Sequence, residues 1–204
     1  MLYSEACERN QGGILAVLQQ WLPRPAQVLE VGSGSGQHAV FFTRHLSGLQ
    51  WQPSEQAELR DGLQERIKLE GRSALAEGSG LADALTLNVS AGPWPPGPFE
   101  AVFTANTAHI MPAAAVADLL AGAARVLAPT GLLLLYGPFH DHGVPTAPSN
   151  AAFDAHLRSI DAAMGIRDAD WITELAAAQH LEPVADVGMP ANNRTLIFRR
   201  PPAA

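Results

Sequence analysis

The stretch from residue 27 to residue 36, Gln-Val-Leu-Glu-Val-Gly-Ser-Gly-Ser-Gly, constrains the fold of this 204-residue chain more than any other. An apolar run with β-branched residues leads directly into three glycines at every second position, and amphipathic helical spacing follows. This order predicts a strand, a tight turn and the start of a helix. Such a turn brings a nucleotide-like ligand against bare backbone and the amides of a helix N-terminus.

The spacing of the glycines narrows the choice of ligand. A dinucleotide fingerprint, G-x-G-x-x-G, needs a glycine at position 37, which is Gln37. The pattern is instead acid-x-G-x-G-x-G, formed by Glu30, Gly32, Gly34 and Gly36. It resembles motif I of the Rossmann-like S-adenosylmethionine methyltransferases. That resemblance implies that the glycines and Ser33 contact S-adenosylmethionine, and that Glu30 interacts with its amino acid portion. A purely structural turn with a surface glutamate is the alternative.

Short strand-forming runs alternate with helical spacing along the rest of the chain. Strands are expected at 26–31, 49–52, 85–89, 99–105, 131–136, 181–189 and 195–199, and helices fill most of the intervals. The alternation, without repeat or linker, predicts one α/β domain over residues 1–204, with a doubly wound sheet and helices on both faces. An N-terminal helix within residues 1–23 is expected to cover the cofactor pocket.

Several finer expectations accompany these elements. The second strand should stop at Pro53, and Phe41 should face the sheet. The loop over 137–150 holds too much Gly, Pro, His and Asp for a core segment, and Phe153 to Met164 should mark one helix.

The end of the chain distinguishes between sheet types. Only Pro190-Ala191-Asn192-Asn193 joins the last two strands, so they should form a hairpin and the last strand should be antiparallel to its neighbour. A mostly parallel sheet with one such antiparallel last strand is typical of seven-stranded Rossmann-like methyltransferases. A dehydrogenase domain would not end this way.

Composition limits the function classes. The formal net charge is −7 and Lys68 is the only lysine, so the basic stripe that nucleic acids require is missing. Cys7 stands alone, which excludes an intrachain disulfide and a cysteine zinc site. The sequence starts without a signal-peptide pattern and has no apolar run near 20 residues, so we expect a cytoplasmic protein with no membrane partner. His140-Asp141-His142 has no third ligand, and we interpret it as a loop tip rather than a metal site.

An acidic residue lies at the end of the predicted second strand, and an amide residue lies at the end of the third. Glu55 ends the second strand, where a carboxylate can accept hydrogen bonds from both ribose hydroxyls. The alternative is an acid that interacts with the dipole of the next helix. Asn88, with Val89 beside it, ends the third strand, where its carbonyl would accept from the adenine amine. The alternative is an asparagine that forms its hydrogen bonds within its own loop.

Asn106, Thr107 and His109 follow the fourth strand, at the carboxyl edge where ligands bind in open α/β sheets. Asn106 lies in the motif IV position of the methyltransferases, where it would contact cofactor and acceptor. His109 is the candidate general base, with an ordinary imidazole pKa of about 6.5. A pocket wall or a packed core histidine is the alternative.

Several fragments outside the glycine motif resemble one family, methyltransferase-like 26, also described as domain of unknown function 938. They are residues 8–10, 36–39, 51–54, 105–110, 136–139, 149–154 and 189–193. This resemblance implies a Rossmann-like S-adenosylmethionine methyltransferase fold over nearly the whole chain. Two departures stand out: Glu55 replaces a common Asp, and His140 and His142 stand where basic residues are expected.

The sequence therefore predicts an S-adenosylmethionine-dependent methyltransferase that acts on a small molecule and releases S-adenosylhomocysteine. A non-enzymatic S-adenosylmethionine-binding scaffold and an NAD(P)-dependent oxidoreductase are the alternatives. The polar residues of the late fragments are expected to enclose the acceptor or cover the pocket: Arg9, Asn10, Tyr136, Asn150, Asn192 and Asn193. The sequence leaves the acceptor and the oligomeric state open.

Overall fold

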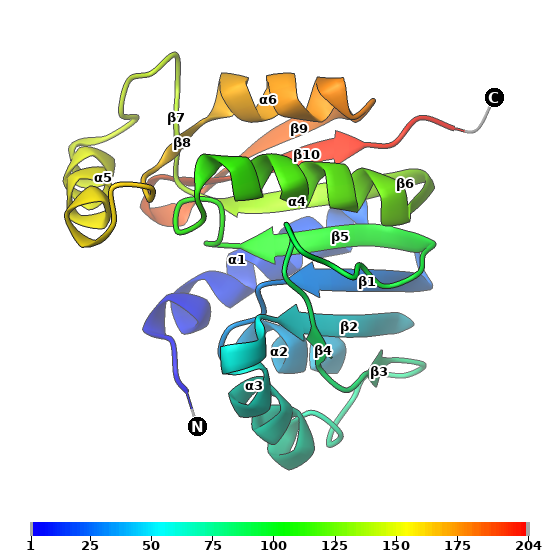
Figure 1. Cartoon of the computed structure of the whole chain (residues 1–204). Coiled ribbons are helices and arrows are strands. Elements are labelled where there is room, and N and C mark those ends of the chain that lie inside the picture. The colour runs from blue at the N-terminus through cyan, green and yellow to red at the C-terminus, as the bar shows by residue number, and fades with distance from the viewer. Residues whose placement is uncertain (1, 203–204) are drawn as a thin grey trace.

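The computed structural model describes residues 2–202. It contains a sheet with strand order β3-β2-β1-β5-β6-β10-β9 between two layers of helices (Figure 1). The strands of this order are β1 (Ala26–Val31), β2 (Leu49–Glu55), β3 (Gly80–Leu81), β5 (Phe99–Ala105), β6 (Leu127–Gly137), β9 (Glu182–Met189) and β10 (Asn193–Arg199). β10 is antiparallel to both β6 and β9, and the other pairs are parallel. The predicted fold class and the terminal hairpin are confirmed.

The described residues contain six α-helices, five of which cover the faces of the sheet. They are α1 (Glu5–Trp21), α2 (Gln37–His45), α3 (Ala57–Glu70), α4 (Ala113–Val126), α5 (Pro148–Ile160) and α6 (Ala169–Ala178). α1, α2 and α3 bury apolar side chains against one face, and α4 and α6 against the other. α5 lies beyond the sheet, at the end toward which the parallel strands point (Figure 1). No helix within residues 2–202 is long and apolar enough to cross a membrane.

The central strands are apolar on both sides because helices cover both faces of the sheet. In β5, Phe103 packs into the core under α1 and α2, and its neighbour Val102 into the core under α4. In β6, Leu134 packs into the core under α1 and α2, and Leu133 packs into the core under α4. This two-sided burial explains why these strands are continuous apolar runs rather than alternating ones.

β2 differs from its prediction because it continues through Pro53 to Glu55. Pro53 has no N–H to donate, but no strand pairs with the outer side of β2 at this residue. β3 pairs with β2 at Gln50 and Trp51, and the short β4 (Leu85–Thr86) pairs with its last two residues. The proline lies between these two stretches, so no ladder hydrogen bond is lost there. The predicted strand at 85–89 is reduced to β4.

Three further expectations are wrong. Phe42, not Phe41, is the fully buried ring of α2. Within the 137–150 loop, Phe139 is buried and forms β7 (Phe139–His140), which pairs with β8 (Arg167–Asp168). α5 ends before Met164, and its Phe153 is 37% exposed because α5 does not pack on a sheet face.

No helix connects β4 to β5. The Gly- and Pro-rich segment 87–98 crosses the sheet face in front of β1 and β2 instead (Figure 1). A cavity of about 530 Å³ lies under part of it, lined by Gln27, Gln50 and Phe99 among others. These residues are at or near the beginnings of β1, β2 and β5, away from the strand ends that carry the glycine turn.

Candidate active site

The glycine turn follows β1, and its three glycines have positive φ angles of 72°, 54° and 74°. A Cβ on Gly32 would lie 2.5 Å from Thr107 Cγ2, and one on Gly36 would lie 2.7 Å from Leu63 Cδ1. These two glycines therefore allow close packing against the β5 loop and α3. A Cβ on Gly34 would meet nothing within 4 Å. Gly34 is thus the position where bare backbone faces open space, as a ligand cradle requires.

Glu55 is next to this turn, as predicted. Its Oε2 accepts a hydrogen bond from the Gly34 backbone N–H at 2.7 Å, and its Oε1 accepts one from Gln56 N–H at 2.8 Å. The carboxylate therefore ties the end of β2 to the turn after β1. A ribose would meet a carboxylate that is already oriented, and the ribose role stays a prediction.

Glu30 lies beneath the turn and is only 2% exposed. Its Oε2 accepts a hydrogen bond from Trp51 Nε1 at 2.9 Å. Burial raises the pKa of Glu30 to about 7, against the opposite effect of the hydrogen bonds from Trp51 and Ser33. The alternative of a surface glutamate is wrong, because the side chain is buried.

Asn88 follows β4 at the same edge, and the neighbouring Leu87 N–H donates to the Glu55 carbonyl at 2.9 Å. The Asn88 side-chain oxygen accepts from the N–H groups of Ser90 and Ala91, at 3.0 and 3.1 Å. These bonds give Asn88 the structural role that was the alternative. Its contact with adenine, and that of Val89, stay predictions.

The loop after β5 brings Asn106 and His109 together. Asn106 has a positive φ of 59° and donates its N–H to the Tyr136 carbonyl at 2.8 Å. A Cβ on Gly137 would lie 3.8 Å from His109 Nδ1 and 3.9 Å from Asn106 Oδ1. Both polar side chains therefore face the end of β6, at the carboxyl edge predicted for the acceptor.

His109 is buried, and its ring meets Phe153 of α5 edge-on with 5.2 Å between the centroids. Burial lowers the pKa of His109 to about 4, and the positive charge of Arg167 acts in the same direction. The expected pKa of about 6.5 is therefore wrong, and the imidazole is neutral at pH 7. A neutral imidazole can still accept a hydrogen bond from an acceptor group.

Asn10 connects α1 to the site. Its Oδ1 lies 2.7 Å from His38 Nε2, and its side chain also hydrogen-bonds Tyr136. His38 was part of a sequence fragment but was not predicted as a site residue. Its position at the start of α2 places it opposite α1 only once the two helices pack. Burial lowers its pKa to about 4.

The N-terminal segment is tied to the same helix start. Ser4 N–H donates to Gln37 Oε1 at 2.6 Å, and Gln37 Nε2 donates to the Ser4 carbonyl at 3.2 Å. Arg9 differs from its prediction, because its side chain is 71% exposed and pairs with Glu5 on the outer surface of α1. Asn10, rather than Arg9, faces the pocket side of this helix.

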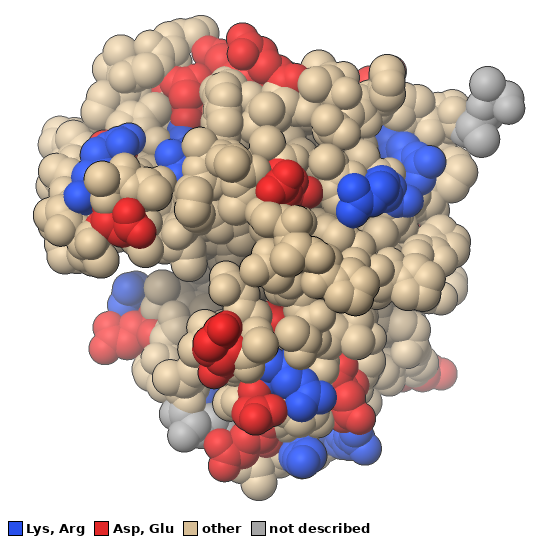
Figure 2. Space-filling view, in the orientation of Figure 1, with Lys and Arg blue, Asp and Glu red and all other residues tan. Residues whose placement is uncertain are grey.

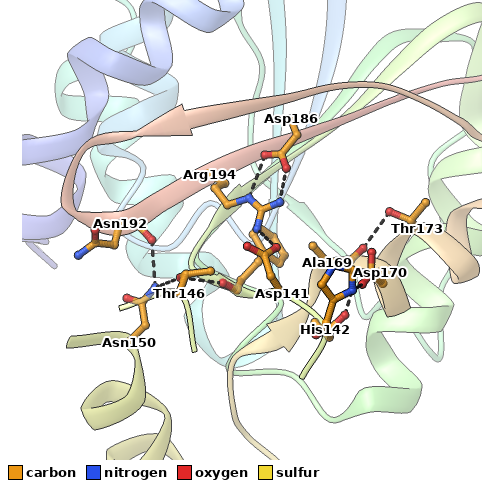
Figure 3. A network of polar contacts seen from close by, with 12 residues as sticks. Asp141, His142, Thr146, Asn150, Ala169, Asp170, Thr173, Asp186, Asn192 and Arg194 are labelled. Atoms are coloured by element: carbon orange, nitrogen blue, oxygen red, sulfur yellow. Dashed lines mark hydrogen bonds and ion pairs between the residues drawn. The ribbon is translucent and has the colours of Figure 1, made fainter. Parts of the chain in front are cut away.

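The predicted asparagines of the late fragments form part of a network (Figure 3). Asn150 Nδ2 donates to Thr146 Oγ1 at 2.9 Å and to the Asn192 carbonyl at 3.1 Å, so it ties α5 to the β9–β10 hairpin. Arg194 of β10 pairs with Asp186 and Asp141 in the same network. Asn193 instead donates to carbonyls of its own turn. Asn150 and Asn192 are brought together, and contact with an acceptor stays a prediction.

The two histidines of the 140–142 tripeptide do not converge. His140 Nε2 lies 3.9 Å from Asp154, whereas His142 Nδ1 lies 2.5 Å from Asp170 of a different helix. Within residues 2–202, no group of three His, Cys, Asp or Glu side chains is arranged to hold a metal ion.

The molecule is hollowed at the edge where these elements meet. Figure 2 shows a recess between α5 above and the N-terminal part of the chain below. The sheet order, the antiparallel β10 and the glycine turn define the fold of the Rossmann-like methyltransferases.

Comparison with known proteins agrees with this class. The chain is similar to mitomycin 7-O-methyltransferase MmcR, with a TM-score of 0.77 and 17% identity over 96% of this chain and 54% of that one. It is also similar to the S-adenosylmethionine-dependent methyltransferase SibL, with a TM-score of 0.75 and 17% identity over 96% of this chain and 56% of that one. An O-methyltransferase family 2 protein from Planctomyces limnophilus matches with a TM-score of 0.73 and 17% identity over 95% of this chain and 59% of that one.

The chain belongs to the family described as Protein of unknown function (DUF938), which matches residues 1–200. The family expectation drawn from the late fragments is confirmed to that extent, and the name methyltransferase-like 26 stays a prediction. The chain spans between 54% and 59% of the length of the three solved structures named above. At these low identities, the likeness establishes the fold alone.

Proposed function

We propose that this protein is an S-adenosylmethionine-dependent methyltransferase that acts on a small molecule. The observation that carries the proposal is the open space at Gly34, which lies beside a carboxylate that is already oriented by the same glycine's N–H. The solved structures with the same fold include proteins named as S-adenosylmethionine-dependent and O-specific methyltransferases. Their substrates differ from one name to the next, and the acceptor of this chain is left open.

The residues of the turn fit such a cofactor. Gly34 offers bare backbone, Glu55 offers a carboxylate for the ribose hydroxyls, and Glu30 offers an acid near the amino acid portion. When bound, the cofactor supplies an electrophilic methyl group. Asn88 and Val89 follow β4, which pairs with the end of β2 that carries Glu55, and they would contact the adenine.

The acceptor would lie across the end of β6. Asn106 and His109 face this point, and Asn10 with Tyr136 approaches it from α1. Displacement at a sulfonium has a good leaving group, so holding the nucleophile in line accounts for much of the rate. The neutral His109 suits this role, because it can orient an O–H or N–H by accepting its hydrogen bond.

The first test replaces Gly34 by valine. The branched side chain enters the open space proposed for the ligand, and because Gly34 has a positive φ of 54° the substitution also strains the turn itself. We expect calorimetry to show S-adenosylhomocysteine binding in the parent and none in Gly34→Val. Gly143→Val is a matched control, since Gly143 also has a positive φ, of 75°, and no atom within 4 Å of a Cβ, but lies in the loop after β7.

Two results would contradict the proposal. Binding of NAD as tight as that of S-adenosylhomocysteine would favour an oxidoreductase. Unchanged binding in Gly34→Val would place the cofactor elsewhere. A scaffold is distinguished from an enzyme by turnover: release of S-adenosylhomocysteine in a metabolite screen, with mass spectrometry of the methylated product, supports the enzyme.

A further inference from the structure

A buried acid lies directly under the glycine turn. Glu30 precedes Gly32 by two residues, and its carboxyl group is enclosed by the sheet, with Trp51 Nε1 as a hydrogen-bond donor at 2.9 Å. A carboxylate in such a site carries a desolvation cost that one N–H donor only partly offsets. The group is therefore poised to hold a proton when no ligand is present.

The charges around Glu30 reinforce this tendency. The carboxylate of Glu55, from the end of β2, disfavours a second negative charge nearby. From α1 the neighbour is Cys7, a thiol whose pKa is raised by burial, so it stays neutral and offers no counter-charge. On α2, His38 is neutral at pH 7 because burial lowers its pKa to about 4. Arg66 of α3 donates to Glu70 and to the Leu2 carbonyl rather than to Glu30.

We propose that binding of the cofactor at the glycine turn expels the proton held by Glu30, so that cofactor affinity depends on pH. This inference rests on the proposed function, which places the cationic amino group of the cofactor next to this acid. The Glu30 O–H bond breaks, the proton passes to the solvent, and the cofactor ammonium becomes the missing counter-charge. Trp51 Nε1 keeps its hydrogen bond to the resulting carboxylate.

The direction of the effect follows from the free state. With a pKa of about 7, Glu30 is protonated in about nine of ten molecules near pH 6 and in about one of ten near pH 8. The bound state keeps Glu30 ionised, so binding releases close to one proton near pH 6 and almost none near pH 8. The dissociation constant is then about tenfold weaker near pH 6 than near pH 8.

The test is calorimetric titration with S-adenosylhomocysteine in paired buffers that differ in ionisation enthalpy. The difference in heat between the two buffers gives the number of protons released. We expect near one proton at about pH 6 and near zero at about pH 8 for the parent. Glu30→Gln keeps the shape of the side chain and removes the proton, so proton release near pH 6 should be lost, because the ligand's ammonium group keeps its own proton when it binds.

A second variant tests the Glu30 carboxyl group by changing its hydrogen-bond donor instead of Glu30 itself. Trp51→Phe removes the N–H that favours the carboxylate, so Glu30 should hold its proton to a higher pH and proton release near pH 8 should exceed that of the parent. Proton release that is absent in the parent near pH 6, or that persists in Glu30→Gln, overturns the inference. Failure of the parent to bind S-adenosylhomocysteine at any pH overturns the proposed function instead.

Discussion

Glu55 illustrates how one side chain can serve both the fold and the site. It accepts the Gly34 N–H at 2.7 Å, so it sets the shape of the turn before any ligand arrives. Glu55→Ala removes the carboxylate that is proposed to accept hydrogen bonds from the ribose hydroxyls, and it should weaken cofactor binding by about 2 kcal/mol, or about thirtyfold. Calorimetry with S-adenosylhomocysteine measures this loss, and Glu55→Asp should retain part of the affinity. Parent-like binding in both variants would reduce Glu55 to a helix-start acid.

His109 carries a prediction that needs no acceptor. Burial lowers the pKa of its imidazole to about 4, so its ring protons should show no titration in NMR spectra between about pH 5.5 and 8. His109→Asn identifies the resonance by its disappearance. This variant should leave affinity for S-adenosylhomocysteine within about threefold, because the ring contacts Phe153 and the end of β6 rather than the glycine turn. A titration near 6.5 would restore His109 as an ordinary general base.

At the scale of elements, the site is covered by segments that are far apart in the sequence. α1 reaches the start of α2 through Asn10, and α5 is joined to the β9–β10 hairpin through Asn150. These contacts are polar and few, so the cover can open locally at low cost compared with the sheet.

We therefore expect cofactor binding to slow amide exchange in these covering segments. Mass spectrometry after deuterium exchange, with and without S-adenosylhomocysteine, should show protection in the first turns of α1, in 106–112, in 137–150 and at the hairpin. Asn10→Ala should reduce protection in α1 and leave that of the glycine turn. Protection confined to 32–36 would argue against a cover.

The sequence predicted elements where a local signal and the tertiary environment agree. The glycine turn and the terminal hairpin are each determined by a few adjacent residues, so the sequence alone predicts both. The sequence predicts a strand end at Pro53, but the gap between β3 and β4 makes the missing N–H of this proline harmless. The cover contact between Asn10 and His38 depends on how α1 packs on α2, and no local pattern encodes that packing.

For the whole molecule, three buried groups shape stability against pH. His38 and His109 have pKa values lowered to about 4, so the stability they contribute is complete above about 6.5 and is lost as the pH falls toward 4. Glu30 has a raised pKa of about 7, so its contribution is present below about 4.5 and is lost as the pH rises to 7. Between these limits the two histidines outweigh the single acid.

Denaturant unfolding should therefore show stability that rises from about pH 4.5 to 6.5. Glu30→Gln isolates the acid: relative to the parent, this variant should gain stability as the pH rises from 5 to 8, by up to about 3 kcal/mol for the full shift. A pH-independent difference between the two proteins would show that Glu30 is ionised in the folded state throughout this range.

The place of β10 in the sheet has a consequence for the order in which the protein can be assembled during translation. β10 is the last strand in the chain, yet it lies between β6 and β9. Until residues 193–199 have left the ribosome, the backbone N–H and C=O groups on one side of β6 have no strand to pair with, and β9 has no partner strand. The nascent chain therefore carries one open edge of an apolar strand while residues 138–192 are being synthesised, and the sheet closes only when β10 is inserted between β6 and β9.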